Sequence, residues 1–273
     1  MKKPKTKSIP IGIILIGAIL TMGIFGFGAL ASYREIKEEK SFVMDGINEI
    51  HVDMTSIPVH IIRTEAGGTI KFHLHGKAKR GIILVTEMIN NTVVVQAKRK
   101  LDGPAIEDVL LDVYIPENYG KNLLTKTTSG IVNVDSINLT AFVFNTSSGG
   151  LAAEKLTAEK ITIDSTSGNL NIKDLDSREL KIRGSSSDVM ITCKQFSNQN
   201  IDIKTTSGNV TLELPGTAEF IYKIVTASGQ FNSDFPINKS ENTSKINLEG
   251  QLGNRSNKVS LQASSGNITI LKK

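Results

Sequence analysis

The sequence is poor in cysteine and in aromatic residues. Among 273 residues it has one cysteine, no tryptophan, four tyrosines and ten phenylalanines. A single cysteine excludes an intramolecular disulfide. The apolar content comes instead from short runs of isoleucine, leucine and valine, separated by glycine, serine, threonine and asparagine. This composition predicts many short β-strands joined by tight turns.

Most of the chain also lacks an excess of one charge. The formal net charge is +5, but four of the 32 basic residues lie in an arm over residues 1–8, which leaves 28 basic against 27 acidic residues. The remainder is therefore nearly neutral and has no electrostatic footprint for nucleic acid. We expect no nucleic-acid partner, and we expect the basic arm to be cytoplasmic.

One long uncharged segment follows this arm. Residues 8–33 carry no charge, and residues 9–30 are dominated by isoleucine, leucine, glycine and phenylalanine. Such a segment can cross a ~30 Å hydrocarbon core as a helix, and the lysines before it predict a cytoplasmic N-terminus. We therefore predict a single-pass signal-anchor over residues 9–33 in the cell membrane, a juxtamembrane linker over 34–44 and an extracytoplasmic domain over 45–273. A signal peptide cleaved near Ala29-Leu30-Ala31 is the alternative, and it also exports the domain.

A short turn signature recurs through the exported part. It has two small residues, mostly hydroxyl-bearing, followed by glycine, as in Thr128-Ser129-Gly130. The third positions are Gly130, Gly149, Gly168, Ser187, Gly208, Gly229 and Gly266. Their successive steps are 19, 19, 19, 21, 21 and 37 residues, the last being about one repeat plus an insertion. We interpret these residues as structural turn positions, where glycine supplies a positive φ.

Apolar residues fall into columns around each turn. They stand two and four residues after the third position, as Val132 and Val134 do, and seven and five residues before the next one, as Phe142 and Phe144 do. Each repeat thus predicts two strands whose alternate side chains point inward. The frame extends upstream with Ile57 in the glycine position, and four less regular strands are predicted at 70–74, 82–85, 93–95 and 109–115.

A repeat of this size cannot bury its apolar side alone, but stacked copies share a continuous core. We predict an all-β fold, a right-handed parallel β-helix or solenoid of 19–21-residue rungs. It has an irregular first part (45–120), regular repeats (121–231) and an inserted loop (232–256) with a short strand at 245–249. An antiparallel sandwich is the alternative, and the strict register of the columns favours the solenoid. The last strand, at 268–271, would leave an open edge at which two copies could associate.

Two stretches carry a resemblance to a known family. One is Leu111-Asp112-Val113-Tyr114-Ile115-Pro116 leading into Thr128-Ser129-Gly130, and the other runs from Leu212-Glu213-Leu214-Pro215 to Ala227-Ser228-Gly229. They resemble the bacterial β-strand-repeat family of adhesin-like proteins, whose membrane-bound members include the LiaG-like accessory proteins of Gram-positive bacteria. The resemblance covers roughly residues 45–273. It implies a β-solenoid that faces the cell wall, a link to envelope-stress sensing and no catalytic residue.

Cysteine and histidine offer no complete site in the sequence. Cys193 has the parity of an inward residue and is interpreted as a small apolar group. His73 and His75 share one face of a strand, with His51 and His60 upstream, but no cysteine or spaced carboxylate completes a zinc set. We expect these histidines to be exposed.

The acidic residues are scattered singly. Asp164, Asp174, Asp188 and Asp202 show no repeated pattern, so surface charge is favoured over the facing carboxylates of a glycoside hydrolase. Phosphate-binding and dinucleotide-binding glycine motifs are absent from the sequence. We expect no catalytic, cofactor-binding or metal-binding residue and no cofactor.

These observations favour a membrane-anchored, non-catalytic extracytoplasmic module that binds an envelope protein or a cell-wall polymer, as an accessory to envelope-stress sensing. The alternatives are an adhesin-like surface protein and a polysaccharide-active β-helix enzyme. About seven rungs at ~4.8 Å give a rod of only ~35 Å, which is short for an adhesin that must clear the wall.

Overall fold

The computed structural model describes residues 33–99, 107–237, 245–253 and 256–273. All regular elements in these ranges are strands. They are Arg34–Val43 (β1), Glu49–Met54 (β2), Val59–Thr64 (β3), Thr69–Ala78 (β4), Ile82–Ile89 (β5), Thr92–Arg99 (β6), Glu107–Pro116 (β7), Asn122–Thr127 (β8), Val132–Thr146 (β9), Leu151–Ser167 (β10), Leu170–Ile172 (β11), Leu175–Ser186 (β12), Val189–Thr192 (β13), Asn200–Thr205 (β14), Val210–Leu214 (β15), Phe220–Thr226 (β16), Phe231–Ser233 (β17), Ile246–Leu252 (β18), Lys258–Ala263 (β19) and Ile268–Lys272 (β20).

The segment predicted to cross the membrane falls almost entirely outside these ranges. The basic arm and the signal-anchor lie outside the described residues, except for Tyr33. In the part of the chain that the structure describes, no helix is both long and apolar enough to cross a bilayer.

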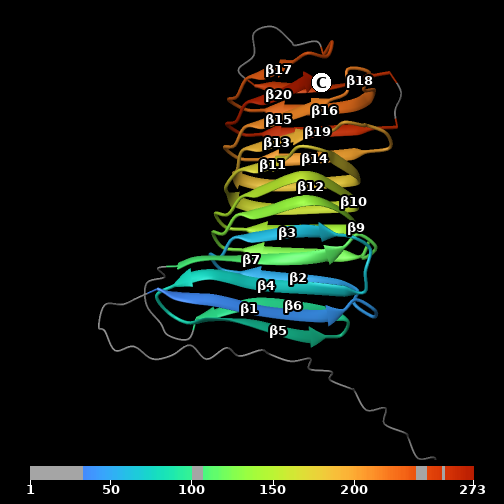
Figure 1. Ribbon diagram of the computed structural model, residues 1–273. Helices are drawn as coiled ribbons and strands as arrows, with labels where there is room; N and C mark the ends of the chain where they lie inside the picture. The colour runs from blue at the N-terminus through green and yellow to red at the C-terminus, as the bar shows by residue number, and fades with distance from the viewer. Residues whose placement is uncertain (1–32, 100–106, 238–244, 254–255) are drawn as a thin grey trace, which may run out of the picture. The chain divides into compact units, whose positions relative to one another are not determined.

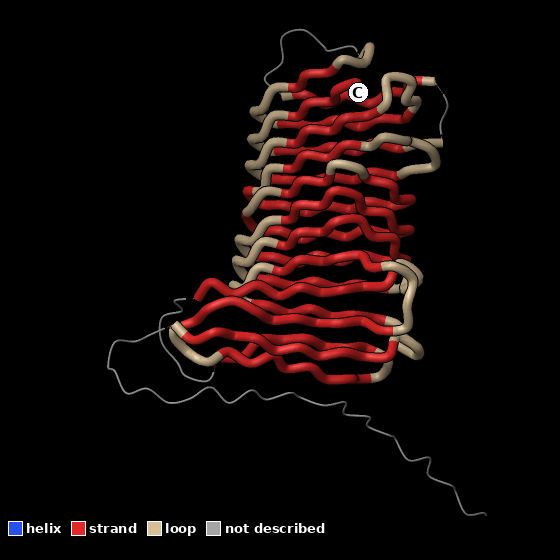
Figure 2. The backbone as a smooth tube through the Cα atoms, in the orientation of Figure 1, coloured by secondary structure: helices blue, strands red, loops and turns tan. Residues whose placement is uncertain are grey.

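Two stacks of strands enclose one hydrophobic core in residues 31–273 (Figure 1, Figure 2). Within the described ranges, one stack runs β5–β6–β2–β8–β9–β10–β12–β14–β19–β16–β18. The other runs β1–β4–β7–β3–β9–β10–β11–β13–β15–β20–β17. Ten steps of ~4.8 Å make each stack about 50 Å long, longer than the ~35 Å expected from the regular repeats alone.

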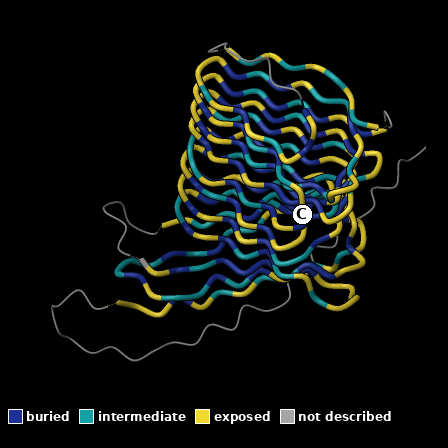
Figure 3. Tube along the Cα trace, turned by 90° about the horizontal axis from the view of Figure 1, so that it is seen from above, coloured by how far each residue is buried: buried dark blue, intermediate teal, exposed yellow. Residues whose placement is uncertain are grey.

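The register of the inner strands follows the sequence repeat. Leu151 pairs in parallel with Val132 on one side and with Leu170 on the other, each 19 residues away. The inward columns are fully buried, as at Ile161 and Ile163, and burial of each such side chain contributes about 1.5–3 kcal/mol. Viewed along the stack, buried and exposed positions alternate (Figure 3). This parallel register confirms a solenoid rather than an antiparallel sandwich; the right-handed sense stays a prediction.

The central rungs have a third segment that the two-strand repeat did not predict. In β9, the buried side chains Ile137 and Leu139 follow Val134, and two consecutive outward residues at each bend shift the inward parity. The same segment recurs in β10, where Leu156 pairs with Ile137 in β9 and with Leu175 in β12. A single alternating pattern of apolar residues does not predict this segment, because each bend shifts which residues point inward.

The first rungs do not stack in chain order. Strands β2 and β3 lie between the pair β6 and β7 and the pair β8 and β9, although β6 and β7 come later in the sequence than β2 and β3. The four strands predicted between residues 70 and 115 are confirmed as β4, β5, β6 and β7.

The predicted linker over residues 34–44 is instead strand β1, which pairs antiparallel with β4. A linker was predicted because the segment is rich in charged residues, and most of these are exposed on the strand. Its core side is carried by two apolar residues: Ile36 is buried, and Phe42 makes an edge contact with Phe72 at 6.0 Å between ring centroids. The Glu38 carboxylate also accepts a hydrogen bond from the backbone N–H of Leu84 at 2.5 Å.

The last rung also stacks out of order. Strand β19 lies between β14 and β16, and β20 lies between β15 and β17, so the C-terminal rung is inserted beneath the rung that precedes it in the chain. The buried side chain of Asn257 ties the neighbours together, because it accepts from Gln199 N at 2.9 Å and donates to the Glu219 carbonyl at 2.9 Å. The 37-residue step from Gly229 to Gly266 is therefore one step back along the stack, and Gly208 is adjacent to Gly266 rather than to Gly229.

Two expectations for this end are corrected. The strand at 268–271 is not an open edge, because β20 is paired on both sides. The segment expected as a loop contributes β18, an antiparallel strand on β16 that overlaps the predicted short strand over residues 246–249 and covers that edge. Residues 238–244 and 254–255 of the expected loop lie outside the described ranges.

The turn glycines are needed for close approach rather than for positive φ. Of the six signature glycines, Gly168 alone has a positive φ. A Cβ on Gly149, Gly208 or Gly266 would lie only 2.2, 1.8 or 1.9 Å from the backbone oxygen of the turn below. Positive φ is therefore the wrong explanation at the other five positions. In the turn that has Ser187, a glycine stands three residues earlier, at Gly184, and makes room for the serine Cβ.

This packing predicts different costs for two glycine-to-alanine variants. Gly208→Ala places a Cβ against the Ser187 carbonyl, so we expect it to lower the free energy of unfolding by about 2–3 kcal/mol. Gly68→Ala is the matched control, since a Cβ there meets nothing within 4 Å, and its effect should stay within about 0.5 kcal/mol. Urea unfolding followed by circular dichroism measures both. Equal effects of the two variants would contradict the close-approach explanation.

Candidate functional site

One long edge of the solenoid is built from the stacked turns. Three residues before the third position, a buried threonine accepts a hydrogen bond from the turn N–H: Gly149 N donates to Thr146 Oγ1 at 2.7 Å, and Gly229 N donates to Thr226 Oγ1 at 3.0 Å. Gly130 and Gly208 bind Thr127 and Thr205 in the same way. The turn signature and the apolar columns did not reveal this element. The sequence feature that indicates this hydrogen bond is a threonine three residues before the third position, which occurs in four of the seven repeats.

Beside these turns runs a polar groove. Its hollow of about 590 Å³ extends across rungs from β8 to β14. One column of its lining carries the exposed hydroxyls of Thr128, Ser147, Thr166, Ser185 and Thr206, one from each turn. Successive turns are joined by backbone hydrogen bonds, such as Ser148 N to Thr128 O at 2.7 Å, so these hydroxyls repeat at the rung spacing of ~4.8 Å.

A second column of the groove carries charge. It consists of Lys126, Asn145, Asp164, Arg183 and Lys204, which are cross-strand neighbours in that order. Three cations and one carboxylate give the groove lining a formal charge of +2. The Arg183 guanidinium is bound to the Asp202 carboxylate on the next strand. The groove thus presents repeated hydroxyls beside a mostly basic row.

Cys193 is buried, as the sequence predicted, and it faces the core. Burial raises the pKa of its thiol to about 12, with a smaller contribution from the carboxylates of Asp174 and Asp176. A neutral buried thiol is unsuited to nucleophilic attack.

The four scattered aspartates have different surroundings. Asp164 is exposed in the groove, Asp188 accepts from Asn209 N at 2.8 Å, and Asp202 binds Arg183. Asp174 is buried and lies 3.0 Å from the Lys194 ammonium. The surface-charge interpretation is therefore wrong for Asp174, which continues the buried alternation of Leu170 and Ile172.

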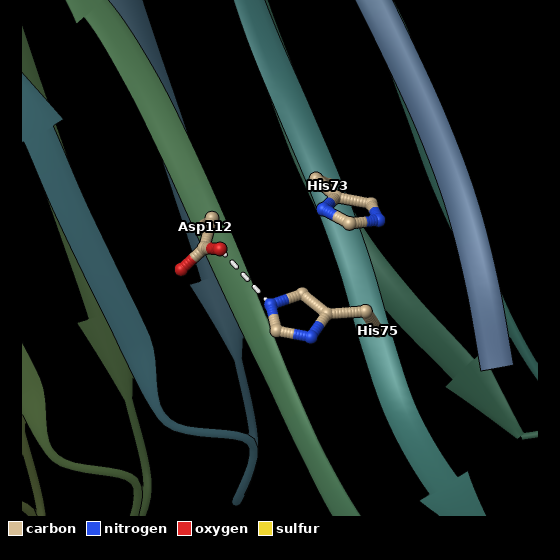
Figure 4. Close-up of side chains that lie close together, drawn as sticks. All are labelled: His73, His75 and Asp112. Atoms are coloured by element: carbon tan, nitrogen blue, oxygen red, sulfur yellow. Dashed lines mark hydrogen bonds and ion pairs between the residues drawn. The ribbon is translucent and has the colours of Figure 1, made fainter. Parts of the chain in front are cut away.

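A second polar cluster lies on the outer face of β3, β4 and β7. His73 on β4 and His60 on β3 are the direct cross-strand neighbours of Asp112 on β7. His75 Nε2 is 2.9 Å from Asp112 Oδ2, and the rings of His73 and His75 stack with centroids 4.6 Å apart (Figure 4). No carboxylate beside these histidines was expected from the sequence, and Asp112 corrects that expectation. The β4–β7 pairing that brings it there joins strands far apart in the sequence.

Asp112 is the centre of this cluster and is itself buried. Its Oδ1 lies 3.7 Å from His60 Nδ1, and it accepts a 3.3 Å hydrogen bond from the Tyr114 hydroxyl on Oδ2. Burial, and then the Asp112 charge, raise the pKa of Tyr114. On its far side, His60 Nε2 is 2.7 Å from Asp135 Oδ1. A continuous polar row therefore crosses four strands.

The stacked parallel rungs define a protein of the β-solenoid class. Residues 47–271 match the model of the family described as Toastrack DUF4097, and the chain belongs to this family. The resemblance to β-strand-repeat adhesin-like proteins thus holds at family level, while the LiaG-like likeness stays a prediction.

Several solved structures match this chain at low sequence identity. A proposed adhesin from Bacteroides fragilis is 10% identical, with 89% of this chain and 100% of that chain covered and a TM-score of 0.49. A proposed cell adhesion protein from Clostridium sporogenes is 14% identical, covering 88% and 100%, with a TM-score of 0.43. A proposed adhesin from Parabacteroides merdae is 11% identical, covering 86% and 96%, with a TM-score of 0.45. Among curated proteins no match is found.

The environment of Cys193 predicts that its thiol is protected in the native state. Because burial raises its pKa to about 12, we expect negligible labelling by a thiol reagent at pH 8 in native buffer. Unfolding in guanidinium exposes the thiol and returns its pKa to the ordinary range, so labelling should then be complete within minutes. Mass spectrometry counts the adducts, and rapid labelling without denaturant would contradict the buried placement.

Proposed function

We propose that this chain is a non-catalytic, membrane-anchored envelope module that holds an extended anionic polymer of the cell wall along its turn-edge groove. The observation that carries the proposal is the pair of parallel columns, one of hydroxyls and one mostly basic, repeated at the rung spacing. A linear polymer with repeating polar groups can meet several rungs at once. A globular ligand would use only part of this surface.

The chemistry of the groove favours a phosphate-bearing polyol or similar polyanion. Lys126, Arg183 and Lys204 can each meet an anionic group, and the threonine and serine hydroxyls can bond to the sugar or polyol between them. Each exposed ion pair is worth only about 0–1 kcal/mol. Useful affinity therefore requires several contacts on one strand of polymer.

The membrane anchor, the extracytoplasmic location and a role as an accessory to envelope-stress sensing belong to this proposal. They rest on the uncharged segment over residues 8–33, on the lysines before it and on the LiaG-like resemblance. An envelope protein remains the second candidate partner, because exposed strand and turn surfaces also suit an extended peptide. Two observations support the absence of enzymatic activity. The thiol of Cys193 is buried and protonated, and the residues that line the groove include one carboxylate, Asp164, rather than a facing pair.

The groove lysines offer a direct test. We expect Lys126→Ala with Lys204→Ala to weaken binding of full-length, detergent-solubilised protein to purified anionic wall polymer about three- to tenfold at low salt, because two of its cations are lost. Co-sedimentation with polymer measures the affinity. Arg183 is left unchanged, because its guanidinium already binds Asp202.

The matched control is Lys155→Ala with Lys258→Ala, which removes the same charge at exposed positions outside the groove lining. It should leave binding within a factor of two. Equal weakening by both double variants would show that only net charge matters and would reject the groove. Binding of neutral glycan as tightly as polyanion would reject the anionic polymer.

A further inference from the structure

We propose that His73, His75 and Asp112 form a binding site for one divalent transition-metal ion of the zinc class. The ligand atoms of these three residues all lie within 4.8 Å of one another, on two adjacent strands. Two imidazole nitrogens and one carboxylate oxygen are a common zinc ligand set, and they also suit copper and nickel. The inference is separate from the polymer groove, which lies on the turn edge.

The sheet sets the positions of all three ligands in advance. His73 and His75 are two residues apart on β4, so their side chains leave the same face. Asp112 stands directly opposite His73 on β7, and the dashed contact in Figure 4 joins it to His75. Because hydrogen-bonded strands fix these backbones, metal binding needs side-chain rotation alone. Ligand atoms of a tetrahedral zinc ion lie ~3.4 Å apart, so the required closure is about 1.5 Å or less.

The buried carboxylate gives an independent reason for a cation. Asp112 is buried, and its Oδ1 has no hydrogen-bond partner among the described residues. A buried carboxylate oxygen without a partner is costly. The ion-pair contacts described for Asp112 come from the imidazoles of His60 and His75. A metal ion bound to Oδ2, the oxygen that faces His75 (Figure 4), would offset the negative charge of this buried carboxylate, while Oδ1 faces His60.

Neighbouring groups complete the surroundings of the site. Tyr114 donates to Asp112 Oδ2, and His60 stands between Asp112 and Asp135, an arrangement that orients a ligating carboxylate from behind. On the open side, a hollow lined by His73, Tyr114, Glu39 and Lys71 leaves room for water at a fourth position. Glu39, opposite His73 on β1, adds negative charge there, and Lys71 adds positive charge.

The experiment uses full-length protein in detergent, purified without a polyhistidine tag and titrated with zinc against a chelating indicator. The chain has four histidines, which allows a matched set of variants. We expect one zinc ion per chain in the wild type and in His51→Ala, which changes a histidine outside the cluster. His73→Ala and His75→Ala should each weaken zinc binding at least tenfold. Both residues are partly exposed, so these variants should keep the wild-type circular dichroism spectrum.

X-ray absorption of the zinc-loaded wild type checks the ligands directly, independently of any variant. We expect imidazole nitrogens and a carboxylate oxygen at ~2.0–2.2 Å. The proposal is overturned if the wild type binds no zinc at 100 µM, if the double variant His73→Ala, His75→Ala binds as the wild type does, or if the absorption spectrum lacks imidazole. None of these outcomes bears on polymer binding, which the lysine variants test separately.

Discussion

At six of the seven turns, the backbone oxygen of the neighbouring turn occupies the space in which a side chain would begin, and Ser187 is the exception. This close approach runs from Ile57 through the signature glycines to Gly229, and it brings the strands on both sides of each turn to pairing distance. The apolar columns can then stack without gaps, and the threonine hydroxyls reach the turn N–H groups. Glycine at this place is thus a requirement of packing between rungs, and the conformation of the single turn is secondary.

The same packing creates both polar surfaces. Because rungs stack in register, any outward residue type that recurs at one position becomes a row along the solenoid, as the groove hydroxyls do. The histidine–aspartate cluster has a different origin. It forms where β4 pairs antiparallel with β7, outside the regular parallel repeat. This combination of side chains therefore does not recur from rung to rung. A periodic surface suits a polymer, whereas a single cluster of convergent ligands suits an ion.

Rungs at both ends stand out of chain order. The rung of β2 and β3 lies between β6 and β7 on one side and β8 and β9 on the other, although all four strands follow it in the chain. The last rung, β19 and β20, lies beneath the rung of β16 and β17 that precedes it. Each inserted rung is paired on both faces, so the C-terminal strand is protected and the stack ends in β17 and β18 instead. Among the described residues, one stack ends in the antiparallel strand β18, whose side chains are half-exposed or exposed, and the other ends in the short strand β17.

The sequence by itself determined the rung. Its period, the inward columns such as Val132 and Val134, the turn positions and the buried place of Cys193 all follow from local alternation and from the residues that a tight turn tolerates. Tertiary structure alone decided the order of the rungs, because every rung offers nearly the same apolar edge and pairing is equally favourable with several neighbours. It also turned residues 34–43 into a strand and placed Asp112 between His60 and His75. Those outcomes depend on strand pairs far apart along the chain, with His75 and Asp112 separated by 37 residues, and such contacts leave no periodic trace in the sequence.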